Sequence, residues 1–375
     1  MKKNILTLLA FILGLWGASA TTATAQQKTY KMNGVAFYNL ENLFDTIHAP
    51  GKNDYEFLPQ GSYKWNTLKY TNKLTNMSQV LASLCTEVGK MKNPLGAAVI
   101  GVSEIENRTV LEDLLKQPAL KDRGYEICFV EGPDRRGVDC AFFYNPKLFQ
   151  LEHTMLVPYI YLKEGDPCTI GFEWKDGRVE AIPELRGDTT YITRGFLVMS
   201  GQMEGEKFHF IVCHWPSRSA ASPVRERAGD QVKELKEALL KQDPNSHIII
   251  MGDFNDDPKN KSMRKCLGCK EKQEACGADD LYNPWYYFLY KIGQGTLLYQ
   301  GNWNLFDQIV FTGNLLGKDR STWKYYKSEI FMRDFLFQTE GKYKGSPKRT
   351  TAGGVWLNGY SDHLPVQTYF VKEVK

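Results

Sequence analysis

The stretch His247-Ile248-Ile249-Ile250-Met251-Gly252-Asp253-Phe254-Asn255 gives the strongest indication of how this chain folds. Its apolar half, from Ile248 to Met251, is typical of a strand that is buried on both faces of a sheet. A carboxylate at Asp253 and an amide at Asn255 follow the apolar run. Two residues apart in an extended segment, they point the same way, although turns rich in Asp, Asn and Gly are also common. The stretch predicts a buried strand with a polar pair at its end.

Polar residues follow other apolar runs in the same manner. Three such residues are Asn39 after residues 35–38, Glu104 after residues 97–102, and His214 after residues 208–213. The ends of strands in α/β folds meet at one edge of a sheet, where such folds place their sites. We therefore expect these side chains to form one site with Asp253 and Asn255.

The rest of the chain alternates between helical and extended patterns. Helices are expected over residues 65–89, 109–116 and 224–241, and strands over 125–130, 138–144, 193–202, 207–213, 306–311 and 366–371. Residues 193–213 form a hairpin that turns around Gly205. No repeat, low-complexity segment or linker interrupts the pattern. Adjacent strand pairs and scattered helices predict an α/β (α+β) fold with partly antiparallel sheets, in a single domain over residues 26–375.

The first 25 residues have the pattern of an export signal. Lys2 and Lys3 precede an apolar run over residues 5–16, and the A-x-A patterns at 18–20 and 23–25 follow it. The apolar run is too short to span about 30 Å of hydrocarbon. We predict a signal peptide over residues 1–25, with cleavage after residue 25 favoured over cleavage after residue 20. The protein is then exported, to the periplasm or outside the cell.

The eight cysteines of the chain fall into different settings. Cys128, Cys140 and Cys213 lie in apolar runs, where a buried free thiol is the expected state. The other group, Cys266, Cys269 and Cys276, lies in a polar segment. One disulfide within this group is expected for an exported chain. A zinc site is the alternative, but it would lack a fourth ligand and a nearby histidine.

Glu104 is the leading candidate for a metal ligand. Magnesium and calcium prefer oxygen ligands, commonly one or two carboxylates with water and a substrate phosphate. Glu106 would share a face with Glu104 if the strand continued. We favour Glu104 because it lies nearer the end of the strand, and a surface glutamate is the alternative interpretation.

The segment Ser361-Asp362-His363 places a carboxylate beside an imidazole just before the last strand. A histidine with a pKa near neutral can take a proton from water when a carboxylate fixes its tautomer. Asp307, at the start of the strand over residues 306–311, is a candidate for that carboxylate. Asp-His pairs are frequent, so this pair needs the other residues to be meaningful.

These residues occur in an order that resembles the endonuclease/exonuclease/phosphatase superfamily, here as an exported bacterial member. The superfamily includes deoxyribonuclease I, the apurinic endonucleases, neutral sphingomyelinases and inositol polyphosphate 5-phosphatases. The matching positions, from the first strand to the last, are Asn39, Glu104, His214, Gly252 to Asn255, Asp307 and Ser361 to His363. The resemblance implies a four-layer α/β/β/α sandwich of two packed mixed β-sheets and a metal-dependent phosphoric ester hydrolase.

The resemblance also implies roles for individual residues. Glu104 would hold a divalent metal, Mg²⁺ first with Mn²⁺ or Ca²⁺ as alternatives, with Asn39 beside it and Asp362 near it. Asp253 and Asn255 would orient the attacking water and bind the phosphate. The pair His363–Asp307 is the candidate general base, and proposed mechanisms differ on whether Asp253 or His363 takes the proton. His214 would contact the phosphate and assist the leaving oxygen.

Four further residues are candidates for phosphate contacts. Arg136, in Asp134-Arg135-Arg136-Gly137, occupies a position where family members often place a phosphate-facing arginine. We favour it over Arg135 because Gly137 leads directly into a strand, and a basic hairpin turn is the alternative. The others are Ser217, Arg218 and Arg194.

The substrate is the least determined part of the prediction. The segment after His214, Trp215 to Ser219, differs from the corresponding motifs of the known nucleases and lipases. The formal charge falls from +4 to +2 without Lys2 and Lys3, which neither supports nor excludes a polyanion. Basic and aromatic residues alternate over 318–327 and 342–349, as in nucleic-acid binding surfaces, or as in a solvated surface with aromatic side chains in the core.

A phosphodiesterase or endonuclease acting on nucleic acid is the leading hypothesis. Cleavage of phospholipid or of small phosphate esters is the second, because the aromatic segment 283–290 is either a membrane-contacting loop or part of the core. A non-catalytic binding protein with this fold is the third. We expect a monomer, and no protein partner is indicated.

Overall fold

The computed structural model describes residues 28–161, 171–182 and 193–374. The predicted signal peptide at residues 1–25 lies outside these ranges. No helix within them has both the length and the apolar character needed to cross a membrane.

The first of two large sheets has six strands. Their order is β18 (Lys324–Ile330), β21 (Val366–Glu373), β1 (Tyr30–Leu43), β4 (Ala97–Ile105), β6 (Asp139–Tyr144) and β5 (Glu126–Cys128). The central pair, β1 and β4, is parallel, while the other neighbours are antiparallel. The sheet is therefore mixed, and the first and last strands of the chain lie side by side in it.

The second sheet has seven strands and is also mixed. Their order is β13 (Cys269–Lys270), β14 (Leu281–Tyr282), β17 (Asp307–Thr312), β12 (His247–Asp253), β11 (Glu206–His214), β10 (Phe196–Met203) and β7 (Gln150–Val157). Strands β11 and β12 are parallel in its centre. The predicted hairpin is confirmed as the antiparallel pair β10–β11.

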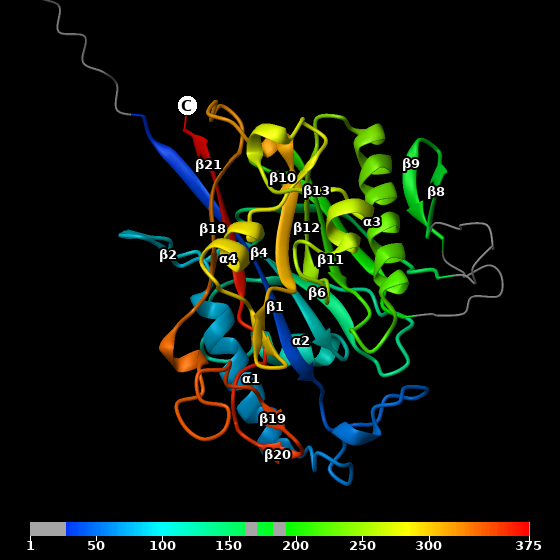
Figure 1. The fold of residues 1–375 in the computed structure, drawn as a ribbon, viewed down its shortest axis with the longest axis vertical. Helices are drawn as coiled ribbons and strands as arrows, with labels where there is room; N and C mark the ends of the chain where they lie inside the picture. The colour runs from blue at the N-terminus through cyan, green and yellow to red at the C-terminus, as the bar shows by residue number, and fades with distance from the viewer. Residues whose placement is uncertain (1–27, 162–170, 183–192, 375) are drawn as a thin grey trace, which may run out of the picture.

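Helices cover the outer faces of the two sheets. Helix α1 (Thr67–Ser83) and α2 (Arg108–Leu115) pack on the first sheet, and α3 (Ser222–Gln242) packs on the second. Figure 1 shows α1 and α3 on opposite sides of the pair of sheets. The short helix α4 (Trp285–Lys291) packs through Trp285 against the hydrophobic core that lies between the two sheets and under α1. The predicted four-layer α/β/β/α sandwich is confirmed.

The remaining elements are short. The two-stranded pairs are β2 (Glu87–Val88) with β3 (Met91–Lys92), β8 (Phe172–Lys175) with β9 (Arg178–Ala181), β15 (Leu297–Tyr299) with β16 (Asn302–Asn304), and β19 (Thr351–Ala352) with β20 (Val355–Trp356). Single helical turns occur at Tyr55–Phe57, Ser262–Cys266, Gln273–Ala275, Gly313–Leu315 and Asp334–Leu336.

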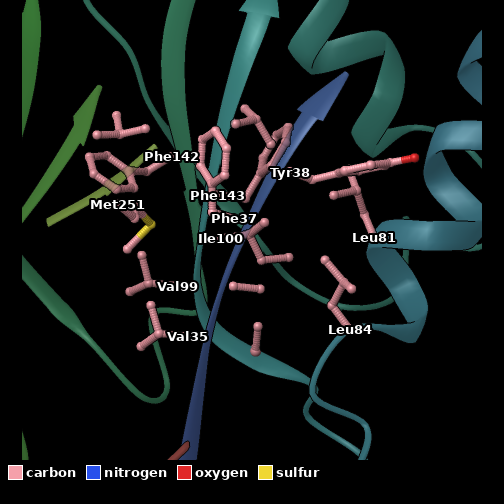
Figure 2. Packing of buried hydrophobic residues seen from close by; sticks show 14 of the residues in the cluster. Val35, Phe37, Tyr38, Leu81, Leu84, Val99, Ile100, Phe142, Phe143 and Met251 are labelled. Atoms are coloured by element: carbon pink, nitrogen blue, oxygen red, sulfur yellow. The ribbon is translucent and has the colours of Figure 1, made fainter. Parts of the chain in front are cut away.

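Side chains alternate along β4 between the two faces of the first sheet. Val99 faces the second sheet near Met251, whereas Leu81 and Leu84 approach from the α1 side (Figure 2). Gly101 packs closely against the second sheet, because a Cβ there would stand 2.5 Å from the Met251 sulfur and 3.2 Å from a Val212 methyl. A larger residue at this position would require these side chains to move, since protein cores are close-packed.

Helix α1 is shorter than the predicted span 65–89. The Asn66 side chain accepts a hydrogen bond from the Lys69 amide and caps the first turn. The helix ends at Ser83, and Cys85 has a left-handed φ of 56°, which continues no helix. Helices α2 and α3 and strands β4, β6, β10, β11, β12, β17 and β21 agree with prediction to within a few residues, whereas β1 extends well beyond the predicted residues 35–38 and strands β7 and β18 were not predicted.

The cysteine prediction was half right. Cys128, Cys140 and Cys213 are buried free thiols, as expected. The predicted disulfide within the second group is wrong, because Cys266, Cys269 and Cys276 are all free. Cys266 belongs to a helical turn and Cys269 to strand β13, so local secondary structure separates thiols that are close in sequence.

Parts of the segments 318–327 and 283–290 belong to the core. Trp323 is fully buried and donates from Nε1 to the Met203 carbonyl, and Tyr325 stacks near Phe311. In segment 283–290, Trp285 is fully buried and donates to the Ile309 carbonyl. These contacts favour the core interpretation for Trp323, Tyr325 and Trp285, whereas Tyr287, Tyr326 and, in segment 342–349, Tyr343 are exposed.

Candidate active site

The polar residues at the ends of β1, β4 and β12 meet in hydrogen-bond contact. Asn39 donates from Nδ2 to Glu104 Oε1 at 3.2 Å and to Asp253 Oδ2 at 3.1 Å. The Asn39 amide oxygen accepts from the Glu41 backbone N–H at 2.9 Å. One neutral amide thus bridges two carboxylates that come from different sheets.

Glu104 reaches the site because β4 is irregular at this point. We expected Asn39 and Glu104 to follow their strands, but both lie within them, since β1 and β4 continue past a bulge. Glu104 has a left-handed φ of 60°, and its Oε2 accepts from the Asn42 backbone N–H at 2.9 Å. Bulges of this kind redirect a side chain and are frequent at functional sites.

Glu106 points elsewhere. Its carboxylate is buried and accepts from the Asp45 backbone N–H at 2.8 Å. Burial, together with Asp45 and Asp54, raises the pKa of Glu106 to about 8, although the bond from Asp45 N–H opposes the shift. The structure therefore separates the two glutamates that spacing left equivalent, and it places Glu104 in the site.

His214, the last residue of β11, faces the same carboxylates. Its Nε2 lies 3.7 Å from Glu104 Oε1 and 3.7 Å from Asp253 Oδ2. Burial holds the pKa of His214 well below its usual value, and the charges of Arg194 and Arg136 lower it further. The imidazole is accordingly neutral at pH 7.

His363 forms a buried pair with Asp307, the first residue of β17. The distance from His363 Nδ1 to Asp307 Oδ2 is 2.7 Å. Burial opposes the imidazolium charge, but Asp307 and Asp253 outweigh it and raise the pKa of His363 well above its usual value. The other nitrogen, Nε2, lies 3.9 Å from Asp253 Oδ2. The predicted orienting contact of Asp307 is present.

Asp253 stands at the centre of the site. Burial raises its pKa to about 7, and Asp307 and Glu104 add to the rise while His363 opposes it. Its Oδ1 accepts from the Asn255 backbone N–H at 2.9 Å. Asn255 lies beyond the end of β12 with φ of 52°, so a turn and not an extended segment brings it to the site. Its Nδ2 donates to the Trp215 carbonyl at 2.9 Å.

Asp362 lies at the edge of the site and is held by an arginine. Its Oδ2 accepts from Arg349 Nη2 at 2.9 Å, and its Oδ1 lies 4.0 Å from His363 Nε2. Arg349 Nε also donates to Glu41 at 3.3 Å. Sequence reasoning placed Arg349 in a basic stretch and did not consider Glu41. The signal that could have found Glu41 is its place in Asn39-Leu40-Glu41-Asn42, beside a predicted site residue.

A buried lysine holds the segment that leads to Asp362 and His363. Lys73 of α1 is fully buried and donates to the Thr350 hydroxyl and, at 2.6 Å, to the Tyr360 carbonyl. Glu41 accepts from the Thr350 backbone N–H at 2.6 Å. Ser361 donates to the Asn39 carbonyl at 2.7 Å. These bonds fasten the segment before His363 to the end of β1.

Replacing Lys73 with methionine is expected to destabilise the fold by about 1–3 kcal/mol, because it removes the buried donor to the Thr350 hydroxyl and the Tyr360 carbonyl and a positive charge near Glu41. Urea unfolding at pH 7 measures the change. Lys116→Met is the matched control, since Lys116 is 70% exposed on α2. A loss in Lys73→Met no larger than in the control would contradict the structural role.

A polar cavity of about 470 Å³ opens beside these residues. Its lining consists of Glu104, Asp134, Arg135, Arg136, Thr193, Arg194, His214, Ser217, Ser219, Asp253 and Asn255. The phosphate candidates Arg136, Arg194 and Ser217 therefore face it. Arg218 does not, because it stacks on Phe306 and donates to Asp257 at 2.9 Å. The expectation for Arg218 is wrong, and its contact with the Asn255 carbonyl makes it a support of the site.

The donor set fits a hard divalent cation. Among the described residues, two sets of side chains each bring their ligand atoms within 4.8 Å of one another. These sets are Glu104–His214–Asp253 and Asp253–Asp307–His363. The carboxylates of Glu104 and Asp253 converge on Nδ2 of Asn39, and carboxylate oxygens are ligands that such cations prefer.

The sequence matches the Endonuclease/Exonuclease/phosphatase family over residues 34–169 and 175–372. No curated protein matches the chain in sequence. Many solved structures resemble its fold, and the three described next do so at low sequence identity, which shows the fold alone.

An endonuclease/exonuclease/phosphatase family protein from Bacteroides thetaiotaomicron is 16% identical with a TM-score of 0.53, covering 92% of this chain and 97% of that one. A mannosyl-6-phosphatase from the same organism is 16% identical with a TM-score of 0.52, covering 92% and 100%. A humanized D. rerio TDP2 is 10% identical with a TM-score of 0.51, covering 90% and 98%. With its family match over most of the chain, this protein belongs to the Endonuclease/Exonuclease/phosphatase family and is a metal-dependent phosphoric ester hydrolase with a deoxyribonuclease I-like fold.

Proposed function

We propose that this site hydrolyses phosphodiesters of nucleic acid with the help of a divalent metal. The observation that carries the proposal is the contact of Asn39 with both Glu104 and Asp253, next to the His363–Asp307 pair and an arginine-lined cavity. Acid–base groups, amides and cations directed at one space are what phosphoryl transfer to water requires.

Glu104 and Asn39 would hold the metal, with Asp362 near it. Mg²⁺ is the first candidate, and Mn²⁺ or Ca²⁺ are alternatives. When bound, the metal would stabilise negative charge on the phosphate in the transition state. The ion pair between Asp362 and Arg349 supports an indirect part for Asp362, because its Oδ2 is already engaged.

Different side chains would transfer the proton and bind the phosphate. Asp253 Oδ2 and His363 Nε2 lie 3.9 Å apart. Asp253 takes the proton from the attacking water while His363 is protonated, the form that its raised pKa favours, and His363 takes it when its imidazole is neutral. Asp307 keeps Nε2 of His363 directed at Asp253. His214 is neutral, so it serves as a hydrogen-bond donor to the phosphate or the leaving oxygen and is a weak proton source. Asn255 and Arg136 would bind the phosphoryl oxygens.

Small phosphate esters are the second candidate substrates. The cavity is polar and enclosed enough to hold a compact ligand, and one structure of the same fold is a mannosyl-6-phosphatase. Strand β18 begins at the end of β21 that is distant from His363, so the basic residues around 318–327 lie away from the site. A lipid substrate has less support because Trp285 is buried.

The setting of the enzyme is also part of the proposal. The pattern of residues 1–25 supports export to the periplasm or the outside, and we propose a monomer with one domain over residues 26–375.

A panel of substrates tests the proposal. The protein is incubated with Mg²⁺, Mn²⁺ or EDTA and with single-stranded DNA, duplex DNA, RNA, bis-p-nitrophenyl phosphate, sugar phosphates or sphingomyelin. We expect metal-dependent cleavage of nucleic acid that weakens as salt rises. Hydrolysis of sugar phosphates without cleavage of DNA or RNA would replace the nucleic-acid assignment. Equal rates for wild type and His363→Ala would favour the non-catalytic binding protein.

A further inference from the structure

Three arginines line the cavity beside His214, namely Arg135, Arg136 and Arg194. Within the described part of the chain, the exposed side chains of Arg135 and Arg136 have no hydrogen bond and no ion pair. By contrast, Arg218, Arg225 and Arg349 around the same site each pair with a carboxylate. The cavity therefore holds two guanidinium groups, of Arg135 and Arg136, that pair with no carboxylate of the described residues, beside Arg194, whose Nε lies 3.5 Å from Asp134.

Arg194 is fixed in place as part of this wall. It is 8% exposed, and its Nη1 donates to the Trp215 carbonyl at 3.2 Å. Its Nε is buried without a hydrogen-bond partner and lies 3.5 Å from Asp134 Oδ2. That oxygen already accepts from the Thr193 hydroxyl at 2.9 Å. The Asp134 carboxylate therefore accepts hydrogen bonds from its own loop and from Thr193, and its ion pair with Arg194 is long, at 3.5 Å.

The loop that carries Arg135 is held equally firmly. Asp134 Oδ1 accepts from the Arg136 backbone N–H at 2.9 Å, and the Arg135 carbonyl accepts from the Asn53 N–H at 2.6 Å. Lys52 donates to the Gly132 carbonyl at 3.0 Å. Because the backbone is fixed on both sides, the Arg135 side chain is presented at the cavity by a rigid support, which reduces the entropy lost on binding.

One phosphodiester does not account for these groups. It carries a single negative charge, and His214, Asn255 and Arg136 are already available to it. A cavity of about 470 Å³ also exceeds what one phosphate fills, since pockets of roughly 300–1,000 Å³ hold ligands of drug size. Room and positive charge are both left over on the side of Arg135 and Arg194.

We propose that Arg135 and Arg194 form a second anion subsite, which binds a second phosphate group of the substrate next to the phosphate that is cleaved. The inference rests on the proposed phosphoester hydrolysis and names the substrate class more closely. The second phosphate comes either from the next linkage of an oligonucleotide or from a small bisphosphate. Bidentate arginine–phosphate bonds make such a subsite selective for phosphate over a neutral group.

Pairs of substrates that differ by one phosphate test the subsite. One pair is thymidylyl-thymidine with and without a 5′-phosphate, and the other is fructose 1,6-bisphosphate and fructose 6-phosphate. We expect the second phosphate to lower KM about 10-fold to 100-fold in one of the pairs, as charge-assisted hydrogen bonds do. The pair that responds identifies the source of the phosphate.

Variants assign the preference to residues. Arg135→Met and Arg194→Met should each collapse the ratio of the two KM values, and Arg194→Lys should restore part of it. Arg108→Met is the control and should keep the ratio, because Arg108 is 53% exposed on α2 and pairs only with Glu112. A wild type with no preference, or a preference retained in both arginine variants, would overturn the inference.

Binding measurements separate this inference from the proposed function. Calorimetric titration of the same ligands into His363→Ala compares their affinities without turnover. Tighter binding of the ligand with two phosphates, by about 10-fold or more, supports the subsite even if no substrate of the panel is hydrolysed. Equal affinities would overturn the subsite even if bis-p-nitrophenyl phosphate is cleaved.

Discussion

Replacing His363 with alanine is expected to lower kcat for bis-p-nitrophenyl phosphate by about 10²-fold to 10⁴-fold, the range that a positioned proton-transfer group contributes. The loss follows from geometry, because Nε2 of His363 lies 3.9 Å from Asp253 Oδ2 and no other imidazole among the described residues pairs with Asp307. Steady-state kinetics at saturating metal measure the effect, and KM should change much less than kcat.

Two further variants make this result specific. Asp307→Asn keeps the shape of the partner but removes the charge that holds the His363 tautomer, so we expect a large loss there as well. His209→Asn is the control. His209 lies on β11, as His214 does, but it is buried and lines a different cavity. Its Nδ1 is hydrogen-bonded to the Ser200 hydroxyl at 2.7 Å. A kcat for His363→Ala within about tenfold of wild type would contradict the proton-transfer role.

The fold could be predicted because its strands are nearly continuous apolar runs. The run Ile248 to Met251 is fully buried in β12, and residues 97–102 are fully buried in β4. Polar residues at the ends of such strands converge for topological reasons, and this is why Asn39, Glu104, His214 and Asp253 could be grouped before their distances were known.

Long-range pairing and backbone detail could not be predicted. Spacing left Glu104 and Glu106 equivalent, and only the bulge with a left-handed φ at Glu104 separates them. Lys73 has the pattern of a helix surface residue, yet the segment around Thr350, 277 positions away, covers it completely. Arg218 follows His214 closely, but its stacking on Phe306 takes it out of the cavity. Each of these depends on contacts between distant parts of the chain.

The second large effect is expected for Glu104→Gln, which should lower activity by about 10²-fold to 10³-fold, as the loss of one group that stabilises transition-state charge does. It should also abolish the rise in melting temperature that Mg²⁺ or Mn²⁺ gives the wild type, because a neutral amide is a weaker ligand than a carboxylate. Differential scanning fluorimetry with and without metal measures the second effect independently of turnover.

Glu106→Gln is the matched control, and it should retain both the activity and the metal-induced rise. The two glutamates lie on one strand end two residues apart, so the comparison holds sequence context nearly constant. Loss of metal stabilisation in Glu106→Gln with retention in Glu104→Gln would reverse the assignment of the ligand.

The free energy of unfolding of the control variant Glu106→Gln should also differ from that of the wild type in a pH-dependent way. The pKa of Glu106 rises from an ordinary value of 4.5 to about 8 in the folded protein, chiefly through burial. Between these values the native state binds more protons at this residue than the unfolded state, so this residue makes the fold less stable as pH rises through that window.

Glutamine at position 106 still accepts the hydrogen bond from the Asp45 N–H but does not ionise. Glu106→Gln should therefore match the wild type near pH 5 and exceed it near pH 8, by on the order of 1 kcal/mol in metal-free urea unfolding. A variant that is less stable than the wild type at pH 8 would mean that the Glu106 carboxylate is charged and stabilising in the fold, against the effect of its burial.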